Sequence, residues 1–221
     1  LRPGDVLCYV TGEPYDTIQS VIGIVGNEPG NMKQYGIEYR QVDMLKSGLP
    51  DEDAVAQAVR DPKVKIAMIQ RSRGYSTRES LSVAQIGSLC RRIHEANPDC
   101  AIMVDNCYGE FVEELEPTDV GADLVVGSLI KNPGGGLAPT GGYIAGRHDL
   151  VEAAAARLTV PGIGKECGST LGNNRFMYQG LFLAPHTVAQ ALKTAIFCAR
   201  MMELLGYQTQ PASDVARHDI I

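Results

Sequence analysis

The sequence contains no tryptophan, few other aromatic residues and only four histidines in 221 residues. Its six cysteines form no Cys-x-x-Cys pair, which excludes the usual zinc and thioredoxin-like patterns. We expect reduced thiols, because a chain of this length without a signal segment rarely depends on disulfides. We also predict no metal site, because the histidines lack ligand spacing. They are His94, His148, His186 and His218.

Long apolar runs and clusters of positive charge are also missing. No run approaches the roughly 20 apolar residues of a membrane-spanning helix. The formal net charge is −6 and the lysines and arginines are scattered, so there is no basic stripe for a phosphate backbone. No GxxxxGK[ST] or GxGxxG string stands where a strand meets a helix, which argues against a nucleotide-binding module. We expect a cytoplasmic protein with no nucleic-acid or membrane partner.

The chain does have a hydrophobic content of 44%, ample for a large core, and it alternates strand-like with helix-like segments. Strands are predicted at 5–10, 37–42, 64–69, 101–104, 124–126 and 142–145. Helices are predicted at 16–24, 51–60, 82–96 and from about 148, with a glycine-rich loop at 26–36. This alternation predicts an α/β fold with a mainly parallel sheet, whose ligands bind at the carboxyl ends of the strands.

The last quarter of the chain has a different pattern. After residue 168 apolar residues recur at helical intervals, across Pro185. We predict residues 1–170 as a large α/β domain and residues 171–221 as a helical connection that begins a truncated C-terminal domain. The chain opens at Leu1 without a methionine and stops at Ile221, where an apolar element has only begun. We therefore expect a fragment of a longer enzyme, with the N-terminal part of the large domain missing.

Two chemically active side chains fall at predicted strand ends, Asp105 after 101–104 and Lys131 after 124–126. An aldehyde cofactor needs an amine that holds it as an imine, and burial of a lysine favours the neutral amine. A carboxylate beside a pyridine nitrogen stabilises its protonated, electron-withdrawing form. Lys131 and Asp105 suit these tasks. Taken singly, a Lys-Asn-Pro-Gly turn is commonly a surface loop and a strand-end aspartate commonly a cap.

Other side chains suit the remaining parts of such a cofactor. Ser128 and the glycine turn that begins at Gly134 offer a hydroxyl and backbone N–H groups for a phosphate. Tyr15, after the first predicted strand, offers an aromatic face for stacking on a ring. The ordinary structural alternatives are a flexible glycine turn and a core tyrosine.

The order and spacing of these residues carry a resemblance. The strings DNCY at 105–108 and GSLIK at 127–131 resemble the Asp-Asn-Thr-Tyr/Phe and Ser-x-Thr-Lys pair of the cystathionine γ-synthase/methionine γ-lyase group of fold-type-I pyridoxal-phosphate (PLP) enzymes. Longer strings are similar to bacterial proteins named aluminium resistance or methionine γ-lyase family proteins. These strings are GEPYDT at 12–17, QRSRGY at 70–75, VDNCYGEF at 104–111, GSLIKNPGGG at 127–136 and QGLFLAP at 179–185. The resemblance covers essentially the whole chain.

The resemblance implies an aspartate-aminotransferase-like architecture with PLP linked to Lys131, a ring-nitrogen contact from Asp105 and phosphate help from Ser128. Tyr15 matches the stacking aromatic by position. Ile130 departs from the family, which has a phosphate-contacting threonine immediately before the lysine, so phosphate binding must use other groups. Members of this fold commonly build their site between subunits, so a homodimer or homotetramer is expected.

The substrate side of the site is less fully represented. Arg71 and Arg73, on the loop after the strand at 64–69, and Tyr108 are the candidates that approach a substrate. A surface position is the ordinary alternative for both arginines. Two further family features, the small-residue loop around the phosphate and the arginine that grips the substrate carboxylate, are expected outside residues 1–221.

The implied activity is a PLP-dependent carbon–sulfur lyase, with methionine γ-lyase-like elimination from a sulfur-containing amino acid. An aminotransferase and a cysteine β-lyase are alternatives, because both use the same lysine and aspartate. An alternative of another class is a non-catalytic aluminium- or stress-resistance protein that retains the fold, since a fold alone does not prove function. The presence of both Asp105 and Lys131 argues against it. The sequence does not determine the physiological substrate.

Overall fold

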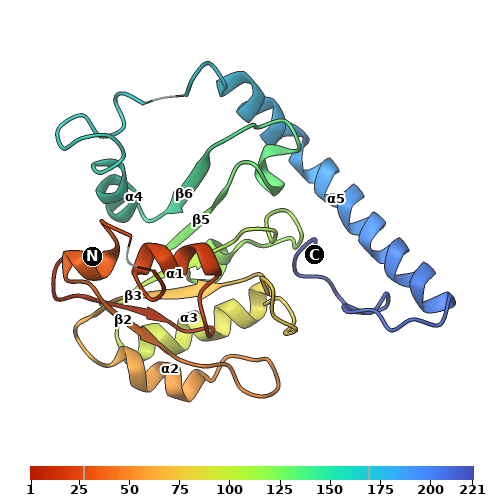
Figure 1. The fold of residues 1–221 in the computed structure, drawn as a ribbon, viewed down its shortest axis with the longest axis horizontal. Coiled ribbons are helices and arrows are strands. Elements are labelled where there is room, and N and C mark those ends of the chain that lie inside the picture. Colours follow the sequence, from red (N-terminus) through yellow and green to blue (C-terminus); the bar gives the residue numbers. More distant parts are fainter. Residues whose placement is uncertain (27, 169) are drawn as a thin grey trace. The chain divides into compact units, whose positions relative to one another are not determined.

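The computed structural model describes residues 1–26, 28–168 and 170–221 (Figure 1). Residues 27 and 169, one in the predicted glycine-rich loop and one in the predicted large domain, lie outside this description. The chain forms two compact units. Unit 1 comprises residues 1–105 and 119–122, and unit 2 comprises residues 106–118 and 123–221. The domain boundary expected near residue 170 stays a prediction.

Four parallel strands form the centre of unit 1, in the order β2-β1-β3-β4. Their bounds are β1 (Val6–Tyr9), β2 (Glu38–Gln41), β3 (Val64–Gln70) and β4 (Ala101–Asp105). All four residues of β1 are buried, because this strand is apolar and lies between two neighbours in a sheet that is covered on both faces. The core of the unit is built around this strand and β3.

Three helices join these strands: α1 (Asp16–Ile22), α2 (Glu52–Val59) and α3 (Val83–Ala96). From β1 the chain moves one way along the sheet to β2, and it then moves the other way to β3 and β4. Right-handed crossovers therefore place α1 on one face of the strands and α2 and α3 on the other, as Figure 1 shows. The direction of winding reverses between β1 and β3.

Short polar signals set the ends of these elements. At the start of α3, the Gln85 N–H donates to Ser82 Oγ at 3.1 Å and the Ser82 N–H donates to Gln85 Oε1 at 2.8 Å, which is a capping box. The predicted loop at 26–36 contains a short 3-10 helix, η1 (Met32–Tyr35), that ends at Gly36 in the left-handed conformation. A second 3-10 helix, η2, spans Pro117–Val120.

Unit 2 contains an antiparallel pair of strands, β5 (Leu124–Ser128) and β6 (Gly142–Gly146). Between them is the 3-10 helix η3 (Asn132–Gly134), and after them come α4 (His148–Ala155) and α5 (Asn174–Leu204). The predicted strands and helices are all present, with ends displaced by a few residues. The fold is mixed α/β with mainly parallel strands, as predicted, although β6 runs antiparallel to β5.

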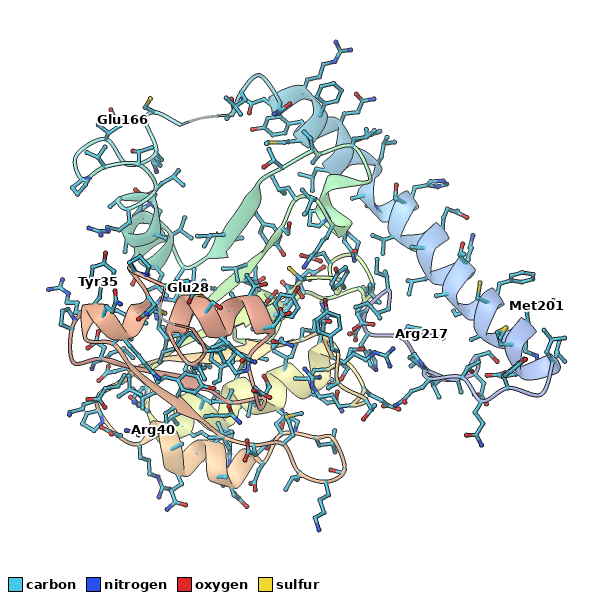
Figure 2. All side chains as sticks on the ribbon, viewed as in Figure 1. Glu28, Tyr35, Arg40, Glu166, Met201 and Arg217 are labelled. Atoms are coloured by element: carbon cyan, nitrogen blue, oxygen red, sulfur yellow. The ribbon has the colours of Figure 1, made fainter. Side chains whose placement is uncertain are left out.

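Helix α5 continues through Pro185, as the helical spacing of the apolar residues across this proline predicted. By length and composition alone it could cross a membrane, which differs from the expectation that no segment is long enough. One helix of this kind is weak evidence for a membrane span, because core helices of other proteins meet the same criteria of length and composition. Many side chains project outward along α5, with Met201 near its C-terminal end (Figure 2). Gly180, Ala184 and Val188, which recur at intervals of four residues, form its buried stripe.

Two glycines let α5 approach the turn formed by η3. A Cβ added to Gly180 would lie 2.1 Å from the carbonyl oxygen of Gly134. A Cβ added to Gly135 would lie 2.3 Å from the carbonyl oxygen of Gly180, and Gly135 itself has a φ of +55°. Since the obstructing atoms belong to the backbone, no side-chain rotation relieves these contacts. The close approach therefore requires glycine on both sides.

We predict that Gly180→Ala lowers the free energy of unfolding of the full-length protein by about 1–3 kcal/mol, the usual cost of overpacking. The clash with Gly134 outweighs the gain in helix propensity, which is at most about 1 kcal/mol. Urea denaturation measures the change. The matched control is Gly168→Ala, because a Cβ at Gly168 meets no atom within 4 Å. Equal stability of the two variants would contradict the close packing.

The segment after α5 is tied back to the helix by Glu203. The Ser213 hydroxyl donates to Glu203 Oε2 at 2.6 Å, and the Ser213 N–H and the Thr209 hydroxyl donate to Oε1 at 2.8 and 2.7 Å. These hydrogen bonds, with those from Ser213 the strongest cause, lower the pKa of Glu203 to about 2. Within the same segment, which carries Arg217 in Figure 2, the Arg217 guanidinium donates to the carbonyl oxygens of Pro211 and Ile221.

We predict that the Glu203 tether is pH-dependent in the acid range. Because the folded pKa is depressed from 4.5, the stabilisation is fully present above about pH 4.5 and is lost as the pH falls through about 2. A carbon-13 NMR titration of glutamate-labelled full-length protein measures this, with Glu203→Gln used to assign the signal. A titration midpoint near 4.5 for Glu203 would refute the tether.

Candidate functional site

A cleft of about 770 Å³ lies at the carboxyl ends of the parallel strands of unit 1. Its walls come from the segments that follow β1, β2 and β3, at residues 11–16, 43–48 and 73–78, with Gln70 at the end of β3. Because the winding of the sheet reverses between β1 and β3, this is the topological switch point at which open α/β sheets bind ligands. The cleft is the candidate ligand site of this unit.

Tyr15, the aromatic residue that the sequence predicted after the first strand for stacking on a ring, lines this cleft. Its backbone N–H donates to Gln70 Oε1 at 3.1 Å, which joins the segment after β1 to the end of β3. Its ring is 38% exposed and stacks with the ring of Tyr75, with the centroids 5.8 Å apart and the planes inclined by 29°. Tyr15 therefore presents an accessible aromatic face rather than serving as core. A contact with a cofactor ring stays a prediction.

Tyr75 and Arg73 belong to a loop that Arg78 holds in shape. The Arg78 guanidinium donates to the carbonyl oxygens of Gln70 at 2.9 Å and Ser72 at 2.7 Å. The Ser76 hydroxyl donates to the carbonyl oxygen of Arg73 at 2.7 Å. Arg73 lines the cleft and is partly buried, so it is not simply a surface residue. Its role in substrate binding stays a prediction.

Arg71 corrects a sequence-based interpretation. The surface position considered for it is wrong, because Arg71 is fully buried. Its Nε donates to the carbonyl oxygen of Leu81 at 3.3 Å, and the Leu81 N–H donates to the carbonyl oxygen of Arg71 at 3.0 Å. The arginine thus ties the end of β3 to the start of α3. Only the three-dimensional packing shows this, because Arg71 and Arg73 look alike in sequence.

Asp105 ends β4 in register with Gln70, the cleft residue at the end of β3. Its carbonyl oxygen accepts from the Arg71 N–H at 3.1 Å. Burial, and then the charge of Asp105, raise the pKa of the Tyr9 hydroxyl, so the carboxylate lies close to the buried end of β1. Asp105 is therefore at the predicted strand end, one strand from the wall of the cleft. Its contact with a ring nitrogen stays a prediction.

Unit 2 carries Lys131 at the turn after β5. The Lys131 N–H donates to the carbonyl oxygen of Ser128 at 3.2 Å, and η3 begins at the next residue. The side chain is partly buried, and Nζ lies 4.4 Å from the centroid of the Tyr108 ring. This is a cation–π distance for the ammonium form. Lys131 and Tyr108, predicted as separate candidates, are thus brought together within unit 2.

Tyr108 has a strained backbone, with a φ of +71°. Left-handed conformations are uncommon for residues other than glycine and recur at functional sites. Its carbonyl oxygen accepts from the Ile220 N–H at 3.1 Å, so the C-terminal segment fixes the position of this loop. In this conformation the Tyr108 ring lies beside the amine of Lys131.

The residues predicted for phosphate binding have clear local roles. Ser128 Oγ accepts from the Ile130 N–H at 3.4 Å, and the Ile130 side chain is 61% exposed. The Gly134 N–H donates to the carbonyl oxygen of Lys131 at 3.1 Å, and a Cβ at Gly134 would lie 1.7 Å from the carbonyl oxygen of Leu129. Close packing therefore requires glycine at 134. Phosphate contacts from Ser128 and Gly134 stay predictions.

Sequence reasoning assigned no task to three polar residues around this turn: the buried Glu110 and Asn132 and the half-buried Tyr143. The Tyr143 hydroxyl donates to Glu110 Oε1 at 2.8 Å, and Asn132 Nδ2 donates to the carbonyl oxygen of Glu110 at 3.0 Å. Glu110 and Asn132 are each 4% exposed. The sequence does offer one signal for two of them: Glu110 and Asn132 are polar residues inside the long motif strings at 104–111 and 127–136. Their burial is a property of the fold.

No group of three or more potential metal-ligating side chains occurs among the residues that the structure describes. All six cysteines are free, in agreement with the expected reduced thiols. Burial raises the pKa of the Cys8 thiol to about 11, so Cys8 is an inert core residue at neutral pH.

Comparison with known proteins identifies the family of the chain. The family model described as methionine gamma-lyase matches residues 1–221. A Bacillus subtilis protein named YnbB is 53% identical over 222 residues, which is 100% of this chain and 52% of that protein. The L-methionine gamma-lyase of Treponema denticola is 26% identical over 139 residues, 62% of this chain and 32% of that protein. The chain thus spans about half the length of YnbB.

A solved structure named carbon-sulfur lyase involved in aluminum resistance, from Clostridium novyi NT, is 51% identical. The two structures superpose with a TM-score of 0.94. The match covers 100% of this chain and 52% of the Clostridium novyi chain. The methionine gamma lyase CalE6 of Micromonospora echinospora is 20% identical, and the match covers 90% of this chain and 49% of the CalE6 chain. Its TM-score of 0.61 shows a similar fold. By the match of the family model over its whole length, the chain belongs to the methionine gamma-lyase family.

Proposed function

We propose that the full-length protein is a PLP-dependent carbon–sulfur lyase of fold type I that acts on a sulfur-containing amino acid. The observation that carries the proposal is the family match over residues 1–221 in a chain that has both Lys131 and Asp105 at strand ends. The names of relatives that act on carbon–sulfur bonds support the reaction class. We further propose a cytoplasmic homodimer or homotetramer.

The chemistry of the available side chains fits this cofactor. Lys131 supplies a partly buried amine beside an aromatic ring, at 4.4 Å from the Tyr108 centroid. Tyr15 supplies an aromatic face in the cleft of unit 1, and Asp105 supplies a carboxylate at the same edge of that sheet. Ser128 supplies a hydroxyl at the end of β5. An amine, an acid, an aromatic face and a hydroxyl are the groups that an aldehyde cofactor with a pyridine ring and a phosphate requires.

When bound, the cofactor supplies an electron sink for the negative charge that develops at the substrate α-carbon. Lys131 would hold the cofactor and would serve as the base that removes the α-proton. Asp105 would keep the ring nitrogen protonated, and Tyr15 would stack on the ring. For γ-elimination Lys131 would also move a proton at the β-carbon. Arg73 and Tyr108 would orient the substrate.

Product analysis distinguishes this proposal from its alternatives. Methionine and one water would give an α-keto acid, ammonia and a thiol. Release of a thiol or sulfide only from cysteine-type substrates would indicate a β-lyase. Formation of a new amino acid from an added keto acid would indicate an aminotransferase. A folded full-length protein that binds no PLP would indicate the non-catalytic alternative.

We predict that Lys131→Ala in the full-length protein abolishes the visible absorption of the lysine-bound cofactor. It also lowers turnover by at least about 100-fold, the lower end of the effect of a general base. Absorption spectra, thiol release and borohydride reduction followed by peptide mapping measure these effects. The matched control is Lys193→Ala, because Lys193 is exposed on α5. Retention of both absorption and turnover in Lys131→Ala would disprove the assigned role.

A further inference from the structure

Glu110 is a buried carboxylate inside the motif that contains Tyr108. Its side chain packs against the backbone of β5, since a Cβ added to Gly127 would lie 2.4 Å from Glu110 Oε1. The same Cβ would lie 2.5 Å from Cε1 of Tyr143, the residue whose hydroxyl donates to Glu110. Burying a carboxylate is costly unless hydrogen bonds compensate. We therefore ask which neighbouring groups the buried carboxylate of Glu110 holds in place.

The backbone of Glu110 holds the turn that carries Lys131. Its carbonyl oxygen accepts from Asn132 Nδ2 at 3.0 Å, and Asn132 immediately follows Lys131. Asn132 is 4% exposed, and no hydrogen-bond partner reaches its Oδ1 within the described part of the chain. Burying an amide oxygen without a hydrogen-bond partner costs free energy. The hydrogen bond from Asn132 Nδ2 to the carbonyl oxygen of Glu110 is the interaction that this asparagine gains in return.

The carboxylate of Glu110 is itself held by a chain of hydrogen bonds. Burial, and then the charge of Glu110, raise the pKa of Tyr143, so its hydroxyl remains a donor. The Asn106 side chain also hydrogen-bonds Tyr143, and its Nδ2 donates to Glu116 Oε2 at 2.8 Å. The Asn106 N–H donates to the carbonyl oxygen of Val126 in β5 at 2.9 Å. Glu110 is thus fixed relative to β5 on one side and to the Lys131 turn on the other.

This arrangement complements the packing of the turn against α5. The glycine contacts between η3 and α5 hold the turn on one side through Gly134 and Gly180. These glycine contacts do not involve the segment that carries Tyr108, so they do not set the distance between that segment and the turn. The hydrogen bond from Asn132 to Glu110 supplies that restraint. Loss of the carboxylate keeps the backbone carbonyl of Glu110 but removes the hydrogen bond from Tyr143 that anchors the residue, so the turn stays folded while the position of the Lys131 amine is released.

We propose that Glu110 is a positioning residue for Lys131, acting through Tyr143 on one side and Asn132 on the other. The inference deepens the proposed function and rests on Lys131 being the amine that binds the aldehyde cofactor. Glu110 touches neither cofactor nor substrate in this role. It determines where the Lys131 amine stands and how readily that amine reacts.

The test compares Glu110→Ala and Glu110→Gln in the full-length protein freed of cofactor. Glutamine keeps an oxygen that accepts from the Tyr143 hydroxyl, so it should restore most of the function that alanine loses. The matched control is Glu114→Ala, which removes an exposed carboxylate four residues later in the same segment. Tyr143→Phe is a milder variant that removes the same hydrogen bond if Glu110→Ala does not fold.

Two readouts follow Lys131. The first is the rate at which the visible absorption appears after addition of PLP, with its pH midpoint. The second, which needs no cofactor, is the pH-dependent acetylation of Lys131 by acetic anhydride, quantified by mass spectrometry against exposed Lys193. We expect Glu110→Ala to slow PLP capture about tenfold, the effect of losing roughly one buried hydrogen bond, and to shift both pH profiles. Glu110→Gln should stay within about twofold of the wild type.

The outcomes separate the two proposals. Wild-type capture rates and pH profiles in Glu110→Ala and Tyr143→Phe would overturn the positioning role, and so would equal losses in Glu110→Ala, Glu110→Gln and Glu114→Ala. Failure of wild-type Lys131 to bind PLP would refute the proposed function instead. In that case the acetylation profiles still report whether Glu110 positions the amine.

Discussion

The parallel hydrogen-bonded ladder of unit 1 is the constraint on which the candidate ligand cleft depends. Parallel strands point their carboxyl ends to the same edge, so the segments after β1, β2 and β3 meet there although they are far apart in sequence. The reversal of winding between β1 and β3 leaves that edge open instead of covering it with a crossover. The cleft therefore follows from the strand order, and its chemistry follows from the residues that the loops supply.

Unit 2 depends on close backbone approach and buried polar contacts. Gly135 and Gly180 allow the turn at η3 and α5 to touch backbone to backbone, which no other residue type permits. The buried side chain of Asn132 then donates to the backbone carbonyl oxygen of Glu110 and ties the turn to the segment that carries Tyr108. A partly buried lysine projects from a turn that is restrained on two sides. Restraint of this kind suits a residue that must present its amine in one position.

The places of several candidate residues in the fold were predictable because strand ends are visible in the sequence. Apolar runs predicted where β1, β4 and β5 end, and the sheet rule then selected Tyr15, Asp105 and Lys131 as residues at ligand-binding edges. The motif order and spacing predicted the family, which the family match confirms. Burial of charged groups was not predictable: Arg71 is a fully buried structural residue, and Glu110 is a buried acid that received no role. Nothing in the local pattern separates Arg71 from its neighbour Arg73.

By itself the sequence determined the alternating α/β elements, the strand ends that carry Tyr15, Asp105 and Lys131, and the family. Local periodicity and motif order suffice for these because they depend on neighbouring residues only. The tertiary structure decided the order of the strands, the cleft at the switch point and the stacking of Tyr15 with Tyr75. It also decided which polar side chains are buried. These features arise from contacts between residues distant in sequence, whose energies no local pattern contains.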